Sequence, residues 1–279
     1  MTNSMTTINM EKKLEPIFKN ISEIEKFNQD KVLQAFRDHS VSDSDFNPTT
    51  GYGYDDYGRD KLERVYASIF RAEDALVRPQ IVSGTHAITV ALFGVLRPGD
   101  ELMYITGEPY DTLTQVIGAH TPSPGSLNDF GVHYQSIPLH NGQVDLNAVK
   151  NKISDKTKVI AIQRSKGYDA RPSITITEME EIIRTIKSWD KDIIIFVDNC
   201  YGEFVEMYEP TDIGADLIAG SLIKNPGGGI VRSGGYIVGK SELVDLASYH
   251  LTAPGIGKEI GHPSDQRKRL CARVFGPTT

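Results

Sequence analysis

The sequence predicts an α/β fold in which a mainly parallel sheet is flanked by helices and follows an N-terminal helical arm. Two observations carry this prediction. The segments "KVIAIQ" and "DIIIFVDN" are β-branched apolar runs without polar alternation, which is typical of strands covered on both faces. Segments with apolar residues at helical spacing lie before and between these runs, so strands alternate with helices along the chain.

Composition places the chain among soluble globular proteins, with 39% apolar and 24% charged residues in 279. The net charge of −7 disfavours nucleic acid or an anionic membrane as the main partner. Cys200 and Cys271 form no CxxC motif, which indicates reduced thiols. The start of the chain lacks the apolar region of a signal peptide, and the longest aliphatic or aromatic run, 193–197, is too short for a bilayer. We therefore expect a cytoplasmic protein.

The first element in order is the arm, residues 1–50, in which "NQDKVLQAFRDHS" predicts a single helix over 28–40. A Gly-, Asp- and Tyr-rich stretch, 43–60, predicts a loop. The next elements are a helix from "DKLERVYASIF", a strand from "PQIVSG", a helix from "HAITVALFGVL" and a strand from "ELMYIT". Thr177 and Glu180 then form a capping-box pattern that opens a helix between the two long apolar strands.

The main domain is expected to span 51–261. After it, 262–279 reads as an irregular basic tail without periodicity, with four basic residues within seven positions. Such a tail is typical of a solvated terminus. The abrupt change in composition also supports the hypothesis that the terminus is truncated or out of frame.

Three polar features follow predicted strands, where ligands bind in open α/β sheets. The first is the turn 83–86, "SGTH", which runs into a helix whose free N–H groups suit an anion such as phosphate. The second is Asp198, a carboxylate that emerges from a buried strand. The third is Lys224, where desolvation is expected to lower the pKa so that the neutral amine can attack a carbonyl.

Each feature alone has a plainer interpretation: an ordinary strand-to-helix turn, a helix cap or structural ion pair, and a lysine with a buried stem at a sheet edge. The order of the three features along the chain favours a functional site over these plainer interpretations. Pyridoxal phosphate needs a phosphate cradle, a carboxylate that keeps the pyridine nitrogen protonated, and an amine that captures the aldehyde. Together the three features favour a pyridoxal 5'-phosphate site.

Through "SGTHAI", "VDNCYGEF" and "GSLIKNPGGG" the chain resembles fold type I pyridoxal-phosphate enzymes of the Cys/Met-metabolism group. Within that group it is most similar to the bacterial aluminium-resistance or methionine gamma-lyase-like (cystathionine beta-lyase-like) proteins. The resemblance covers about residues 50–261 and implies that this part is the cofactor-binding large domain. It also implies that the small C-terminal domain of these enzymes is missing from this chain.

The resemblance implies roles for nine residues. Lys224 would form the aldimine with the cofactor, Asp198 would pair with its pyridine nitrogen, and Tyr110 would stack on its ring; these three form the expected catalytic set. The phosphate would be held by Ser83, Gly84, Thr85 and Ser221. Tyr57 and Arg59 would reach the phosphate of a neighbouring subunit, which implies a homodimer or homotetramer.

The chain departs from the lyase pattern at Ile223, where those enzymes carry a second phosphate-binding hydroxyl, and in the loop 225–229 after the lysine. Several other residues keep two interpretations. Two interpretations, lining the site or lying outside it, remain for Gln163, Arg164 and Ser165. Glu203 either faces the site or is a solvated helix residue, and His86 is either structural or near the cofactor. Cys200 is either a reactive thiol or part of the packed core, and we favour the core. No His, Cys or carboxylate cluster has metal-ligand spacing, so no metal is expected.

The function that follows is a pyridoxal-phosphate-dependent carbon–sulfur lyase acting on a sulfur-containing amino acid. Its steps would be aldimine formation, Cα deprotonation and β- or γ-elimination. Two alternatives remain open. One is another reaction of the same fold, such as an aldol cleavage or transamination, and the other is a truncated, non-catalytic protein of this fold.

Overall fold

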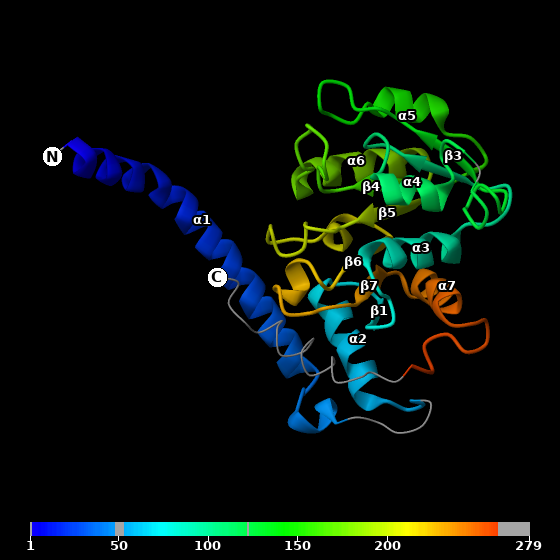
Figure 1. Ribbon diagram of the computed structural model, residues 1–279, viewed down its shortest axis with the longest axis horizontal. Helices are drawn as coiled ribbons and strands as arrows, with labels where there is room; N and C mark the ends of the chain where they lie inside the picture. The colour runs from blue at the N-terminus through cyan, green and yellow to red at the C-terminus, as the bar shows by residue number, and fades with distance from the viewer. Residues whose placement is uncertain (1, 48–52, 122, 262–279) are drawn as a thin grey trace.

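A seven-stranded sheet forms the middle layer of the computed structural model, which describes residues 2–47, 53–121 and 123–261 (Figure 1). The strands are β1 (Asp74–Arg78), β2 (Glu101–Tyr104), β3 (His133–Ser136), β4 (Thr157–Gln163), β5 (Ile194–Asp198), β6 (Leu217–Ser221) and β7 (Gly235–Gly239). Their order is β1-β7-β6-β5-β4-β2-β3. Only β7 among these strands runs against its neighbours, so β1 to β6 all end at the same edge of the sheet.

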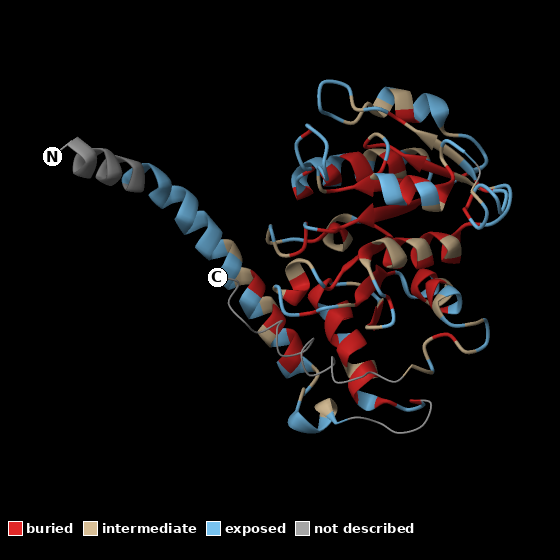
Figure 2. Ribbon diagram, viewed as in Figure 1, coloured by how far each residue is buried: buried red, intermediate tan, exposed pale blue. Residues whose placement is uncertain are grey.

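Helices cover both faces of the sheet, which confirms the predicted fold class (Figure 1). The helices are α1 (Thr2–Asp38), α2 (Tyr57–Ile69), α3 (Gly84–Val95), α4 (Asp111–Ile117), α5 (Leu146–Lys152), α6 (Ile176–Trp189) and α7 (Ser241–Leu251). On one face α3, α4 and α7 pack on strand residues such as Phe196, and on the other α2, α6 and the inner end of α1 pack on residues such as Ile195. Figure 2 shows the resulting buried layers on each side of the sheet.

Most predicted strands are confirmed, but the strand expected from "PQIVSG" is wrong. Residues 79–83 form turns and bends, and the strand lies just before them as β1. Pro79 has no N–H to give to a sheet ladder, which explains why the strand ends at Arg78. Strand β1 was not predicted because it has only three apolar residues, flanked by Asp74 and Arg78.

The capping box of α6 lies two residues earlier than predicted. Thr175 Oγ1 accepts a hydrogen bond from Glu178 N at 3.3 Å, and Glu178 Oε2 accepts one from Thr175 N at 2.9 Å. Thr177 and Glu180 have the same spacing, and both pairs satisfy the sequence pattern. The helix begins at the first of the two, so Thr177 is already inside it.

Helix α1 is much longer than the predicted helix over 28–40, because it already begins at Thr2. Pro16 lies inside it, and an internal proline argues against a helix when only the sequence is considered. The inner end packs on the body through Val32, Ala35 and Phe36, whereas the outer part projects away from the body (Figure 2). Within the described residues no helix is both long enough and apolar enough to cross a membrane.

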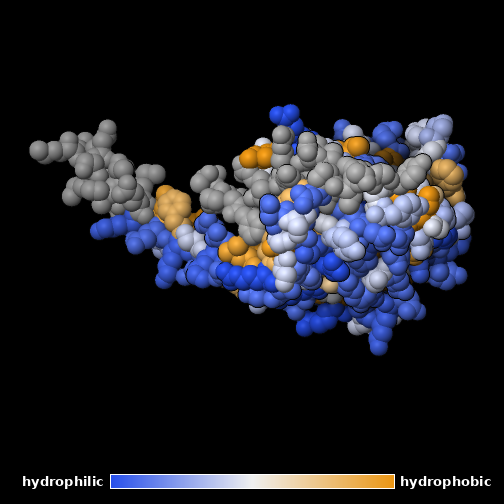
Figure 3. Space-filling model, turned by 90° about the horizontal axis from the view of Figure 1, so that it is seen from below, coloured by the Kyte–Doolittle hydropathy of each residue, from blue (hydrophilic) through white to orange (hydrophobic). Residues whose placement is uncertain are grey.

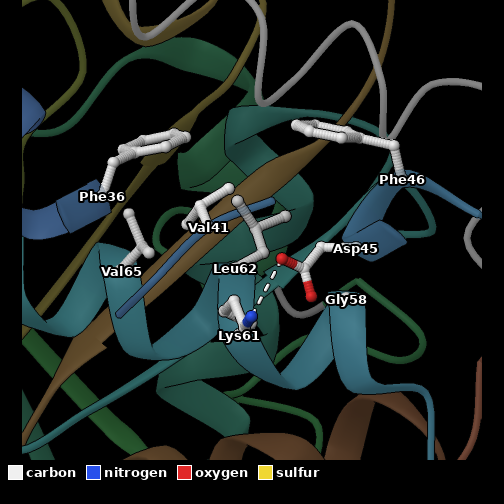
Figure 4. Close-up of a pocket in the computed structure, with 8 residues that line it drawn as sticks. All are labelled: Phe36, Val41, Asp45, Phe46, Gly58, Lys61, Leu62 and Val65. Atoms are coloured by element: carbon white, nitrogen blue, oxygen red, sulfur yellow. Dashed lines mark hydrogen bonds and ion pairs between the residues drawn. The ribbon is translucent and has the colours of Figure 1, made fainter. Parts of the chain in front are cut away.

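Both described ends of the loop predicted over 43–60 contain helical residues. The first end contains the short 3-10 helix η1 (Asp43–Phe46), and α2 begins at Tyr57, where Asp56 caps it by accepting from Arg59 N at 2.9 Å. A small pocket between the end of α1, η1 and α2 is bridged by Lys61 Nζ and Asp45 Oδ2, 2.8 Å apart (Figure 4). Residues 48–52, the expected basic tail over 262–279 and Cys271 lie outside the described residues.

Candidate active site

Two polar side chains end adjacent strands on the same face of the sheet. Asp198 is the last residue of β5 and Ser221 is the last residue of β6. Side chains alternate along a strand, so Asp198 shares the face of Phe196, and Ser221 shares the face of Ala219. Phe196 and Ala219 belong to the core beneath α3. Both polar groups therefore point toward the helix that follows the "SGTH" turn.

The start of α3 meets these strand ends. Ser83 is the N-cap, and its hydroxyl accepts from His86 N at 3.0 Å. The N–H groups of Gly84 and Thr85, in the first helical turn, have no intrahelical partner. A side-chain carbon placed on Gly84 would lie 3.1 Å from Cys200 Sγ and 3.9 Å from Lys224 Nζ, so the start of α3 approaches both residues closely and a larger residue would crowd them.

Lys224 lies three residues past β6, just before the short 3-10 helix η3 (Asn225–Gly227). Its Nζ lies 4.0 Å from the centroid of the Tyr201 ring. Within the described part of the chain no carboxylate lies within ion-pair distance of this amine. Burial acts to lower the pKa of Lys224, but Cys200 and Asp198 outweigh it, so the pKa is raised. The expectation of a lowered pKa is therefore wrong for the free lysine.

Asp198 and Cys200 lie near the Lys224 amine. Asp198 is only 2% exposed, and its Oδ1 accepts from Cys200 N at 3.1 Å. Burial raises the pKa of Asp198, while Lys224 acts in the opposite direction. Burial also raises the pKa of the Cys200 thiol, so this cysteine is a protonated, buried group at neutral pH. The burial of Cys200 matches the packed interpretation, although the residue lies next to the site and not remote from it.

Tyr110 borders the site from the start of α4. Its hydroxyl lies 3.0 Å from Thr85 Oγ1, and its backbone N–H donates to Gln163 Oε1 at 3.4 Å. Burial, with Asp198 as the next cause, raises the pKa of Tyr110. The structure therefore brings together Ser83, Gly84, Thr85, Tyr110, Asp198, Ser221 and Lys224, with Gln163 at the edge of the group.

Arg164 turns away from these residues, although it follows Gln163 directly. Its guanidinium is buried and donates to Asn199 Oδ1 at 2.9 Å and to Glu206 Oε2 at 2.7 Å. It holds the turn that follows β5. His86 makes a structural contact in its own turn, because its Nδ1 accepts a hydrogen bond from Val82 N at 3.2 Å.

The surroundings of Glu203 were the hardest to predict from the sequence. The interpretation as a solvated helix residue is wrong, because its side chain is buried in the turn after β5. Its Oε1 accepts from the Tyr236 hydroxyl at 2.7 Å, and burial raises the pKa of its carboxyl to about 8. Nothing in "NCYGEF" distinguishes this acid from an exposed one, because the partner, Tyr236, comes from a strand 33 residues away.

Tyr57 and Arg59 lie at the start of α2 with different surroundings. The Tyr57 side chain is 76% exposed. Arg59 is buried, and its Nη1 donates to Gly53 O at 2.7 Å and to Glu259 O at 3.1 Å within its own chain. Their expected reach into a neighbouring subunit stays a prediction.

These residues fit pyridoxal phosphate in three ways. The N–H groups at the start of α3, where Gly84 lies close to the Ser221 side chain, suit a phosphate. The Lys224 amine also lies close to Gly84 and forms no ion pair with a carboxylate of the described residues. Asp198 is a buried carboxylate that a protonated ring nitrogen would satisfy. Fold and site together define the class of fold type I pyridoxal-phosphate proteins.

Within that class, the chain belongs to the methionine gamma-lyase family, whose model matches residues 3–277. It is 56% identical over 258 residues to the protein YnbB of Bacillus subtilis, a match that covers 92% of this chain and 61% of YnbB. The chain thus spans about three fifths of the length of that relative.

Two solved structures are similar over nearly the whole chain. One is a candidate cystathionine beta-lyase involved in aluminium resistance from Listeria innocua, with 56% identity and a TM-score of 0.94, covering 97% of this chain and 67% of the other. The second is a carbon–sulfur lyase involved in aluminium resistance from Clostridium novyi, with 44% identity and a TM-score of 0.92, covering 97% and 64%. The suspected family is therefore confirmed.

Proposed function

We propose that the protein binds pyridoxal 5'-phosphate at Lys224 and acts as a carbon–sulfur lyase on a sulfur-containing amino acid. One observation carries the proposal: the Lys224 amine lies close to Gly84 at the start of α3, and the buried Asp198 is near enough to raise the pKa of that amine. The family supports the cofactor, and the names of the two structural relatives support cleavage of a carbon–sulfur bond.

The chain offers a distinct group for each part of the cofactor. The N–H groups of Gly84 and Thr85 and the Ser221 hydroxyl would hold the phosphate, and Asp198 would hold the ring nitrogen. Tyr110 would lie against the ring, positioned by its hydrogen bond with Thr85. When bound, the cofactor supplies an aldehyde that joins the amino group and a cationic ring that accepts electrons from Cα.

Lys224 would carry the proton in this reaction. As a free amine it accepts the Cα proton, and as an ammonium it can return that proton to the departing sulfur group. Asp198 would be ionised next to a cationic ring nitrogen, because an opposite charge at close range lowers a carboxyl pKa that burial alone raises. Cys200 would stay a neutral thiol, so it does not compete for the cofactor aldehyde.

We also propose that the protein is a homo-oligomer, a dimer or tetramer, in the cytoplasm. The projecting part of α1 supports this, because Leu14, Ile17, Phe18 and Ile21 are exposed at the spacing of one helical stripe. Figure 3 shows hydrophobic side chains on this part of the helix among hydrophilic ones. Ile17→Glu should reduce the mass measured by light scattering, whereas Lys19→Glu on the same helix should not.

The test of the cofactor site uses the 279-residue chain with added pyridoxal phosphate, before and after borohydride. We expect a visible absorbance band and cofactor trapped on the peptide that contains Lys224. Lys224→Ala should lose both, whereas Lys158→Ala, which removes an exposed lysine on β4, should keep both. No band with Lys224 intact, or equal trapping in Lys224→Ala, would remove the basis of the proposal.

The test of the reaction follows the products from cysteine, methionine and cystathionine. A carbon–sulfur lyase releases a thiol or sulfide together with ammonia and a 2-oxo acid. If the amino group instead passes to an added 2-oxo acid and no sulfur product appears, the protein is an aminotransferase and the lyase assignment is wrong.

A further inference from the structure

Tyr201 has a backbone conformation that its own packing does not explain. It lies three residues after Asp198 with φ of +67°, in the left-handed region that costs a residue other than glycine of order 1 kcal/mol or more. Phe204 in the same turn has φ of +62°, but its N–H donates to Glu209 Oε1 at 2.8 Å and its ring packs near Phe70. The Tyr201 side chain is 58% exposed, so burial in the core does not hold it in place.

The contact that the Tyr201 ring makes is with the Lys224 amine. The Nζ atom lies 4.0 Å from the ring centroid, well inside the range of about 6 Å over which a cation is attracted to an aromatic face. The left-handed turn at Tyr201 thus directs an exposed ring onto the group expected to do the chemistry. Backbone strain of this kind is found preferentially at functional sites.

We propose that Tyr201 is a positioning residue whose ring holds the Lys224 ammonium whenever that amine is protonated and not joined to a ligand. The inference rests on the proposed role of Lys224. A ring face attracts the ammonium but not the neutral amine, so it stabilises the proton on Lys224 and makes the free lysine a stronger base. A carboxylate in the same place would instead attract the ammonium through a full negative charge and would also attract other cations.

The other groups that face Lys224 do not replace the ring. Asp198 acts from the end of β5 and Cys200 from the turn after it, and both also raise the pKa of Lys224. The start of α3, which approaches the amine at Gly84, brings the positive end of a helix dipole and acts in the reverse direction. The Cys200 side chain also forms a hydrogen bond with the amine, and Tyr201 adds an aromatic face 4.0 Å away that none of these groups provides.

The experiment measures the lysine without cofactor or substrate. Trace acetic anhydride labels amines in proportion to their neutral fraction, and mass spectrometry of the Lys224 peptide at a series of pH values gives its pKa. We compare the wild-type chain with Tyr201→Phe, which keeps the ring, and Tyr201→Leu, which removes it. Tyr168→Leu, in a fully exposed loop, is the matched control.

We expect Tyr201→Leu to lower the Lys224 pKa by about half a unit, which is the usual strength of an exposed cation–aromatic contact expressed as a pKa shift. Tyr201→Phe and Tyr168→Leu should leave it unchanged. If Tyr201→Leu has no effect, the ring does not hold the amine. If Phe behaves like Leu, the hydroxyl and not the ring is responsible, and the proposal is wrong in either case.

A second measurement separates this inference from the proposed function. Cofactor trapping at Lys224 is followed in the same four proteins by borohydride reduction. A pKa shift without trapping in any of them leaves the ring contact intact and removes the cofactor site. Trapping without any pKa shift leaves the cofactor site intact and removes the role of Tyr201.

Discussion

Two clusters in this molecule combine carboxyl groups with cations and differ in how their charges are paired. The first, here called the Glu63 cluster, consists of Glu63, Arg78, Asp74 and Lys258. Glu63 accepts from Val77 N at 3.0 Å and pairs with Arg78 Nη2 at 3.2 Å. Lys258 Nζ donates to Asp74 Oδ1 at 2.6 Å. Each carboxylate in this cluster has a cation at contact distance.

The second, the site cluster, consists of Asp198, Cys200 and Lys224. Here the carboxylate accepts a backbone N–H from Cys200, and the lysine lies against an aromatic ring. In the described structure the two charges influence each other without forming an ion pair. Burial of charge therefore does not by itself indicate a site. What distinguishes a site is charge left for a ligand to satisfy.

The largest expected difference between the clusters is in stability. At pH 8, where Glu63 of the folded chain is ionised, Arg78→Leu should lower the free energy of unfolding by about 3–5 kcal/mol, because it leaves that carboxylate buried without its cation. Lys224→Ala should change it by less than about 1 kcal/mol, because the amine is half-buried and has no ion pair in the described residues. Urea unfolding of both variants measures the two values.

The double variant Glu63→Leu/Arg78→Leu tests the reason for that loss. Replacing both partners of a buried pair by apolar side chains removes the unpaired charge, so much of the stability should return. If the double variant is as unstable as Arg78→Leu, the damage comes from lost packing, and the contrast between paired and unpaired clusters does not hold.

A smaller difference is expected in the dependence of stability on pH. Burial raises the pKa of Glu203, next to the site cluster, to about 8, and that of Glu63 to about 7, both from 4.5. The folded chain keeps these protons where the unfolded chain releases them. The stabilisation is therefore fully present below about pH 4.5 and is lost as the pH rises through each folded pKa.

Each group should contribute a slope of up to roughly 1.4 kcal/mol per pH unit within its window. Glu203→Gln should flatten the curve of unfolding free energy up to about pH 8, whereas Glu63→Gln should flatten it only up to about pH 7. Denaturant unfolding at half-unit steps from pH 5 to 9 gives the slopes. A Glu203→Gln curve parallel to wild type between pH 7 and 8 would mean that Glu203 is ionised in the folded chain.

Sequence patterns found the central strands and the residues at their ends. Strands β4 and β5 are mostly continuous apolar runs, and such a run is typical of a strand in the middle of a sheet that is covered on both faces. Asp198 and Lys224 follow such runs or nearly do, so their meeting at one edge was predictable. Strand β1 was missed because it is short and bracketed by charged residues, and the antiparallel partner that fixes it lies more than 150 residues later.

The surroundings of the site were less predictable, because they depend on contacts between distant segments. The burial of Glu203 depends on Tyr236, and the contact of Tyr201 with Lys224 depends on a left-handed turn that no sequence pattern marks. The direction of the Lys224 pKa was wrong for the same reason. The apolar strand indicated that burial would lower the pKa of Lys224. The sequence did not show that Cys200 and Asp198 would lie close enough to raise it.

The second ion pair of the Glu63 cluster, Lys258 with Asp74, should contribute little to stability. Lys258 and Asp74 pair at 2.6 Å, but about a quarter of each side chain is exposed, so water screens the pair. Their coupling energy, measured by a double-mutant cycle with Lys258→Met and Asp74→Asn, should be below about 1 kcal/mol. Cofactor trapping should stay at the wild-type level in all three variants, because neither residue belongs to the site. A coupling energy as large as the loss in Arg78→Leu would show that pairing itself, and not burial without a partner, controls the stability of this cluster.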